Sequence, residues 1–199
     1  MNTKFFDLSK EKQDRMINGA MQVFAVNGYD HASTDDMVKV AGVSKGLWFH
    51  YFGSKMGLYS FVLDYSMKYL RMEIEIGLND KETDYFKLRK NLEHVHIAVM
   101  RTYPYMYLFL KSVMNEQSTE VLPMIEDYRK QYESLTENAL KSADWSEVDP
   151  RILREKVDVI LDATVESIYR RSFRNSVFSL EHLEDEIDAY IDMLETMVK

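Results

Sequence analysis

The sequence predicts an all-α protein. Only 7 Gly and 3 Pro occur in 199 residues, so few positions would interrupt a helix. Apolar residues recur at steps of three and four along almost the whole chain, which is the period of helices with one buried face. No stretch competes as a strand. Nine helices are predicted, at about residues 9–27, 34–40, 44–51, 54–76, 84–101, 104–117, 121–142, 150–174 and 180–198.

The first two predicted helices have recognisable faces and ends. Ile17, Met21 and Phe24 lie on one face of the first helix, and Gly28 is suited to a left-handed stop. The hydroxyl of Ser33 can accept a hydrogen bond from an amide of the following turn, so the second helix begins there.

Two glycine turns delimit the next two helices. Gly42 favours a turn after the second helix, and Ser44 can cap the short third helix. Ser54 can cap a long fourth helix, which ends at Gly77 before the polar residues 79–80. A helix, a tight glycine turn and a second short helix are typical of a helix-turn-helix.

The later helices open beside prolines, and the last two have the most regular apolar faces. Pro104, Pro123 and Pro150 stand near three of the helix starts. The stripes on the last two helices comprise Leu153, Val157, Ile160, Leu161, Thr164, Ile168, Leu183, Ile187, Tyr190 and Leu194. Two interpretations stay open: a helix pair within one core, or a helical face that two subunits share.

The net charge of −8 is distributed unevenly along the chain. Residues 1–59 hold seven Lys and Arg against six Asp and Glu, whereas residues 60–199 hold 18 against 27. A near-neutral N-terminal part on an acidic body is compatible with an N-terminal part that approaches phosphate.

Composition also excludes several classes of protein. With no cysteine, disulfide scaffolds, thiolate metal sites and cysteine nucleophiles are excluded. The first residues lack the apolar core of a signal peptide, and no segment is long and apolar enough to cross a bilayer. We therefore expect a cytoplasmic protein with no membrane partner.

Residues 41–55 supply the features of a recognition helix. Such a helix needs a capped N-terminus that points backbone N–H groups at phosphate, exposed residues that fit the groove, and apolar residues behind them. Ser44 is the cap, and Trp48 and Phe52 can anchor the inner face. The outer face is left to Lys45, Gly46, Phe49, His50 and Tyr51.

A longer pattern surrounds this segment. It consists, in order, of Phe24, Gly28-Tyr29, Ser33, Asp36-Met37, residues 41–46, Phe49-His50-Tyr51-Phe52, Ser54-Lys55 and Leu58. With this order and spacing, the chain resembles the TetR family of transcriptional regulators over roughly residues 10–60. The resemblance implies a helix-turn-helix DNA-binding domain at residues 1–53. A long helix would join it to a helical ligand-binding and dimerisation domain at residues 54–199.

The resemblance also implies the residues that contact DNA. They are Ser33 and Thr34 at a phosphate-binding helix start, Ser44, Lys45, Gly46 and Leu47 in the major groove, Phe49, His50 and Tyr51 on the outer face, and Lys55 on phosphate. The family commonly has a small hydroxyl residue in place of Leu47 and a tyrosine in place of Phe49. Leu47 can instead touch a thymine methyl group, so the operator sequence stays open. Alternatively, Phe49 and Tyr51 belong to the core and His50 is a solvated surface residue.

The acidic body is rich in aromatic residues and methionine, which suits an apolar pocket with tyrosine hydroxyls. Its candidate lining residues are Tyr103, Tyr107, Leu110, Met114, Tyr128, Tyr132, Val165, Tyr169 and Phe173. Ordinary core packing is the alternative. In the resembled family this region binds an inducer, and two subunits bind one operator. The implied partners are double-stranded DNA, a small effector and a second copy of the chain, which would pair through the apolar stripes of the last two predicted helices.

Two other classes of protein are alternatives. A di-iron enzyme in a helical bundle needs two Glu-x-x-His pairs, and Glu93 with His96 is a single pair. A helical interaction module would use the N-terminal part to bind protein instead of DNA. Nucleotide-binding and hydrolase motifs do not occur in the sequence, so we expect no enzymatic activity, no cofactor and no metal site.

Overall fold

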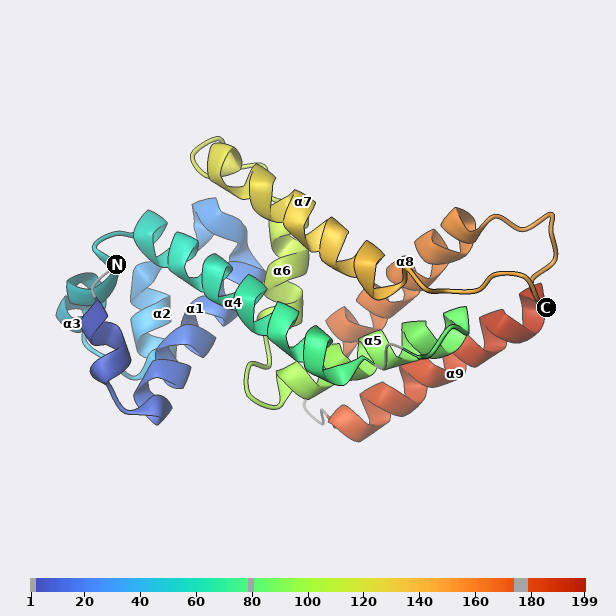
Figure 1. The fold of residues 1–199 in the computed structure, drawn as a ribbon. Helices are drawn as coiled ribbons and strands as arrows, with labels where there is room; N and C mark the ends of the chain where they lie inside the picture. Colours follow the sequence, from blue (N-terminus) through green and yellow to red (C-terminus); the bar gives the residue numbers. More distant parts are fainter. Residues whose placement is uncertain (1–2, 79–80, 174–178) are drawn as a thin grey trace. The chain divides into compact units, whose positions relative to one another are not determined.

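The computed structural model describes residues 3–78, 81–173 and 179–199, and within these ranges the chain is built from helices (Figure 1). The elements are η1 (Thr3–Asp7), α1 (Lys10–His31), α2 (Thr34–Ala41), α3 (Lys45–Phe52), α4 (Lys55–Gly77), α5 (Tyr85–Met100), α6 (Met106–Met114), α7 (Leu122–Ala139), α8 (Arg154–Ser172) and α9 (Leu180–Val198). The all-α prediction is confirmed. Residues 79–80, predicted to follow the fourth helix, and residue 174, the predicted end of the eighth, lie outside the described ranges.

Packing divides the chain into two compact units. The first unit comprises Met1–Met72 and Val99–Ser134, and the second comprises Glu73–Ala98 and Leu135–Lys199. Helices α4, α5 and α7 each contribute residues to both units. The functional boundary between residues 53 and 54 stays a prediction, because a compact unit and a functional domain need not end at the same residue.

In the first unit, α1 packs against α2 and α6. The predicted inner face of α1 is buried, with Ile17, Met21 and Phe24 almost fully covered. Gly28 has a positive φ of 68° and interrupts the helix, as expected of glycine at this position. Helical structure resumes after it and ends at His31, which makes α1 longer than predicted.

The N-terminal helix η1 completes the core behind α3. Phe5 is fully buried, and its ring centroid lies 5.7 Å from that of Tyr51 and 5.2 Å from those of Phe52 and Phe61. The sequence analysis missed this contact, because two adjacent phenylalanines in a short polar segment show no helical period.

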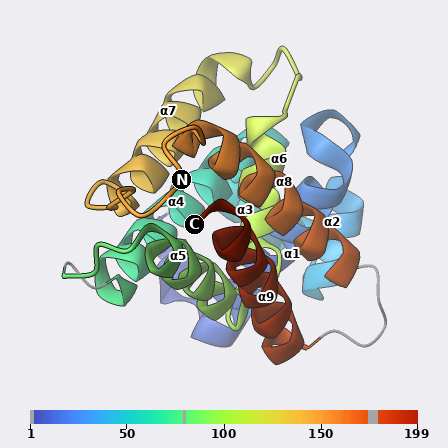
Figure 2. The same cartoon turned by 90° about the vertical axis from the view of Figure 1, so that its right-hand side faces the viewer.

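In the second unit, α8 and α9 pack against each other, as Figures 1 and 2 show. The buried members of their stripes are Val157, Leu161, Ile168, Leu183, Ile187 and Leu194. The interpretation as a helix pair within one core therefore accounts for these six residues.

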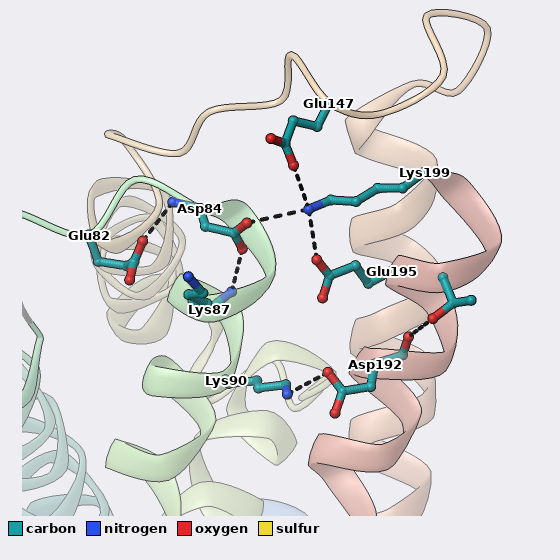
Figure 3. A network of polar contacts seen from close by, with 9 residues as sticks. Glu82, Asp84, Lys87, Lys90, Glu147, Asp192, Glu195 and Lys199 are labelled. Atoms are coloured by element: carbon teal, nitrogen blue, oxygen red, sulfur yellow. Dashed lines mark hydrogen bonds and ion pairs between the residues drawn. The ribbon is translucent and has the colours of Figure 1, made fainter.

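The end of α9 is held by a network of charges around Lys199 (Figure 3). The Lys199 ammonium nitrogen lies 2.8 Å from a carboxylate oxygen of Glu195, 2.9 Å from one of Glu147 and 3.5 Å from one of Asp84. The other carboxylate oxygen of Asp84 accepts a 2.9 Å hydrogen bond from the Lys87 amide in the first turn of α5. Lys199 thus links the C-terminal end of α9 to the start of α5 within the second unit.

Candidate nucleic-acid interface

The turn between α2 and α3 has the geometry of a helix-turn-helix. Gly42 adopts the left-handed conformation, with φ 63° and ψ 39°, and its amide donates a 3.3 Å hydrogen bond to the Lys39 carbonyl oxygen. Trp48 and Phe52 are buried as predicted, and their rings meet edge to face at a centroid distance of 5.6 Å. The inner face of α3 is therefore fixed by apolar packing.

Serine side chains cap the two short helices. The Ser44 hydroxyl accepts a 3.3 Å hydrogen bond from the Leu47 amide, and the Ser33 hydroxyl accepts from the amides of Asp35 and Asp36 at 3.2 and 3.5 Å. A capped helix start still presents other backbone N–H groups outward, and these groups attract anions.

The outer side of α3 is open to solvent. Ser44, Lys45, Gly46, Phe49 and His50 are exposed, while Leu47 and Tyr51 are half-buried. Ser33 and Thr34 at the start of α2 are also half-buried. Tyr51 packs on Phe5 through part of its ring, so the core interpretation accounts for some of its surface.

No neighbouring atom of the chain requires a glycine at position 46. A methyl group built on its α-carbon would meet no atom of the chain within 4 Å, and its φ is not positive. The chain itself therefore leaves room for a side chain at this position.

Lys45 forms an ion pair with Asp35, with 2.7 Å between the ammonium nitrogen and a carboxylate oxygen. Both side chains are more than half exposed, at 53% and 69%. Exposed ion pairs of this kind contribute only about 0 to 1 kcal/mol, so Lys45 can exchange Asp35 for another anion at little cost.

Lys55, which the sequence analysis assigns to phosphate, contacts the turn between α1 and α2 in this structure. Its ammonium group donates hydrogen bonds to the carbonyl oxygens of Tyr29 at 2.9 Å, Asp30 at 3.3 Å and Ala32 at 3.5 Å. An ammonium group has three donors, and here all three serve the turn between α1 and α2. Lys55 therefore caps this turn in the structure, and its contact with phosphate stays a prediction.

The same turn is held by the segment between α6 and α7, which the sequence analysis missed. The Tyr29 amide donates to Glu116 at 2.7 Å, and the Tyr29 hydroxyl donates to Glu120 at 2.6 Å. Burial, and next the hydrogen bond to the Glu120 carboxylate, raise the pKa of the Tyr29 hydroxyl. Arg129 of α7 donates in turn to the carbonyl oxygens of Val113 and Glu116. Contacts between residues so far apart in the chain leave no local sequence signal.

The structure separates the predicted ligand-binding residues into two groups. Those of the first unit are Tyr103, Tyr107, Leu110, Met114, Tyr128 and Tyr132, and those of the second are Val165, Tyr169 and Phe173. All but Met114, Tyr128 and Phe173 are buried. Tyr128 lines a groove in the first unit, which is described below.

The predicted dimer residues also separate into two groups. Leu153, Ile160 and Tyr190 are exposed and Thr164 is half-buried, whereas the other six are covered by the chain's own core. Within the subunit the covered side chains pack into its own core, so the exposed ones are those that a second subunit can contact. Further exposed apolar residues on α8 and α9 are Val159, Met193 and Met197.

The Glu93 and His96 pair is part of an ionic cluster in the second unit. Both side chains are buried, with 3.2 Å between a Glu93 carboxylate oxygen and the His96 Nδ1. A second Glu93 oxygen lies 3.6 Å from the buried Arg89 guanidinium. Among the described residues, no group of three or more side chains is arranged to hold a metal ion. No helix in the described ranges is long and apolar enough to span a membrane.

Comparison with known proteins agrees with the helix-turn-helix geometry, because the chain is similar to transcriptional regulators. Residues 16–60 match the family model described as bacterial regulatory proteins, tetR family. IcaR, the HTH-type negative transcriptional regulator of the biofilm operon icaADBC of Staphylococcus aureus, is 23% identical over 186 residues. That match covers 91% of this chain and 97% of IcaR.

Solved structures share the fold over almost the whole chain. A TetR family transcriptional regulator from Chloroflexus aurantiacus matches with a TM-score of 0.62 at 18% identity, over 98% of this chain and 94% of that one. The transcriptional regulator FadR from Bacillus subtilis, in complex with stearoyl-CoA, matches with a TM-score of 0.54 at 16% identity, over 89% and 96%.

Fold and site together define a helix-turn-helix transcriptional regulator. Over residues 16–60 the chain matches the TetR family model, and its helices follow the fold of TetR-type regulators.

Proposed function

We propose that the chain is a dimeric, sequence-specific DNA-binding regulator that represses transcription. The observation that carries the proposal is α3, a short capped helix whose inner face is anchored by Trp48 and Phe52 and whose outer face is exposed. A helix of this kind fits the major groove of B-DNA. Lys45 and the backbone N–H groups in the first turn of α3, after Ser44, contact phosphate. Leu47, Phe49 and His50 face the base edges. Tyr51 reaches the groove edge, and Ser33 with Thr34 places the start of α2 on a second phosphate.

Charge supports the requirement for two subunits. The N-terminal 59 residues carry a net charge of only +1, so each subunit makes few phosphate contacts. Because affinity for DNA rises with the number of neutralised phosphates, a single subunit binds weakly. Two subunits with recognition helices about 34 Å apart, or a multiple of it, bind a near-palindromic operator.

The exposed apolar residues of α8 and α9 support this pair of helices as the dimer interface. Ile160 and Tyr190 of the predicted interface, together with Val159, Met193 and Met197, leave apolar surface in contact with solvent. Large exposed apolar side chains gathered on one helix pair are typical of a surface that a partner covers.

The named relatives support repression and control by an effector. IcaR is a negative regulator, and FadR of Bacillus subtilis was solved with stearoyl-CoA. By analogy, a small apolar or amphiphilic effector binds the DNA-incompetent form of this chain more tightly and releases it from the operator. A coupling of about 1–3 kcal/mol would weaken DNA binding roughly 5- to 150-fold. Such a regulator acts in the cytoplasm, because its operator DNA is located there.

Selection from a randomised pool of DNA duplexes tests the proposal. We expect enrichment of one near-palindromic sequence.

Lys45→Ala should weaken binding to that sequence. It should also lower the salt dependence of the binding constant by about one counterion per subunit. Lys141→Ala removes the same charge from an exposed position of the second unit and should bind as the unchanged protein does. If folded protein enriches no sequence at low salt, the chain is a helical interaction module instead.

A further inference from the structure

A groove of about 660 Å³ lies along one side of α4 in the first unit. Five of its ten lining residues are aromatic: Phe6 of η1, Phe61, Tyr65 and Tyr69 of α4, and Tyr128 of α7. This volume is within the range of small-molecule sites, roughly 300–1,000 Å³. Of these residues, only Tyr128 was predicted from the sequence to bind a ligand.

The aromatic rings on α4 form a row. Phe61, Tyr65 and Tyr69 follow one another at one-turn spacing, with successive ring centroids 6.0 and 6.1 Å apart. Tyr65 and Tyr69 are nearly parallel, at 13° between ring planes. Phe6 is half exposed at the edge of this row, 6.2 Å from Phe61. Ring faces in a row offer stacking and edge contacts to a flat aromatic molecule.

The charges along the groove favour an uncharged ligand. Asp64 and Lys68 are the two ionised residues of its lining, and they pair with each other at 2.8 Å. Because these two opposite charges largely cancel, the groove carries no net charge that would select an anion or a cation, and its aromatic wall is the main feature that a ligand contacts.

Tyr65 connects the groove to α1. Its hydroxyl is hydrogen-bonded to the Tyr103 hydroxyl at 2.5 Å, and Tyr103 donates to Asp14 of α1 at 2.7 Å. Lys10 of α1 donates to the same Asp14 and Tyr103, at 2.6 and 2.9 Å. The Tyr65 ring therefore lines the groove while its hydroxyl takes part in a network that ends on α1. Helix α1 packs directly against α2 of the helix-turn-helix.

We propose that this groove is an effector site for an uncharged, flat aromatic molecule, and that its occupancy weakens DNA binding through Tyr65. A ligand that stacks on the Tyr65 ring displaces its hydroxyl from Tyr103, which changes the hydrogen bonds that hold Asp14 and Lys10. The binding step stands on the groove alone, whereas the regulatory step rests on the proposed function.

Binding is tested with the full chain in the absence of DNA, by titration with N-phenylnaphthylamine. This probe is uncharged and aromatic, and its fluorescence rises in apolar sites. We expect saturable binding, which Ser60→Phe, by filling the groove, and Tyr128→Ala, by removing a wall, each weaken at least tenfold. Ile76→Ala removes an exposed apolar side chain of the second unit, outside the groove and the proposed dimer interface, and is the matched control. The proposal is overturned if both groove variants bind the probe as the unchanged chain does, or if Ile76→Ala abolishes binding.

The mass of the protein in solution tests whether a second copy of the chain occupies the groove. If the groove were covered by a second copy of the chain, Ser60→Phe would lower the oligomeric mass. We expect that mass to stay unchanged, and a lower mass would overturn the proposal.

Regulation is tested by adding the same probe to the protein bound to its selected duplex. We expect a 5- to 150-fold loss of DNA affinity, the usual range of allosteric coupling. Tyr65→Phe keeps the ring but removes the hydroxyl, so it should still bind the probe while its DNA affinity no longer responds. An unchanged response in Tyr65→Phe would overturn the role of Tyr65. If the unchanged chain binds no duplex, the proposed function fails, and the probe titration still decides whether the groove binds aromatic molecules.

Discussion

The Lys55 ammonium group donates a 2.9 Å hydrogen bond to the Tyr29 carbonyl oxygen and lies 4.4 Å from the centroid of the Tyr29 ring. Tyr29 is also bound from the other side, by Glu116 at its amide and by Glu120 at its hydroxyl. The turn that leads from α1 into the helix-turn-helix is therefore fixed by one cation and two carboxylates. A change in any of them reaches α2 and α3 through the backbone of this turn.

Lys55→Met is expected to destabilise the fold. The substitution removes a charged donor from three carbonyl oxygens, and losing charge-assisted hydrogen bonds costs roughly 1.5–3 kcal/mol. Urea denaturation should show this loss in the free energy of unfolding. Lys45→Met removes an exposed lysine with a single ion pair and should cost less than about 1 kcal/mol. Equal stabilities of the two variants would contradict the capping role of Lys55.

Gly46→Ala is expected to separate stability from DNA binding. The new methyl group meets no atom of the chain, and alanine favours a helix over glycine by up to about 1 kcal/mol. The thermal midpoint should therefore stay the same or rise. On the proposed interface the methyl group lies against DNA, so binding to the selected duplex should weaken roughly tenfold, equivalent to about 1.4 kcal/mol. Unchanged affinity would place this surface away from DNA.

Ile160→Glu combined with Met193→Glu is expected to yield a folded monomer. Both side chains are exposed within the subunit, so the charges disturb only a surface that a second copy covers. Leu183→Glu and Leu194→Glu would instead bury a charge in the subunit's own core, which is strongly destabilising. Sedimentation gives the mass and circular dichroism confirms folding. A folded double variant that keeps the mass of a dimer would move the interface elsewhere.

Asp84 is expected to make stability depend on pH. Burial raises its pKa, but the hydrogen bond from the Lys87 amide and the charge of Lys199 outweigh burial and hold the pKa below its usual value. Such a carboxylate stabilises the fold fully above its unfolded pKa of about 3.9, and this contribution is lost as pH falls through the lower folded value. Asp84→Asn should therefore be less stable than the unchanged protein at neutral pH, and the difference should shrink in acid. A difference that stays the same from neutral to acidic pH would contradict this.

Helix positions follow from local sequence, and for that reason they were predictable. The serine caps at Ser33 and Ser44, and the glycine turns at Gly28 and Gly42, act on neighbouring residues, so their effect is visible in the sequence. The burial of Trp48 and Phe52 follows from their spacing of one helical turn.

Partners of side chains that lie far apart in the chain were not predictable in the same way. A lysine after a serine cap fits a phosphate contact, and nothing near Lys55 indicates that three carbonyls of an earlier turn use its donors. Periodicity likewise shows that Leu183 and Ile160 belong to apolar stripes, but not that the first is covered within the subunit and the second is exposed. That distinction depends on the angle at which α8 and α9 cross.

The buried ring of Phe5 has a practical consequence for work with shortened forms of the protein. A version that starts at Ser9 would leave the rings of Phe52 and Phe61 without their cover, although every residue of α1, α2 and α3 would still be present. Its failure to bind an operator would report a damaged core and would say nothing about which side chains meet the bases.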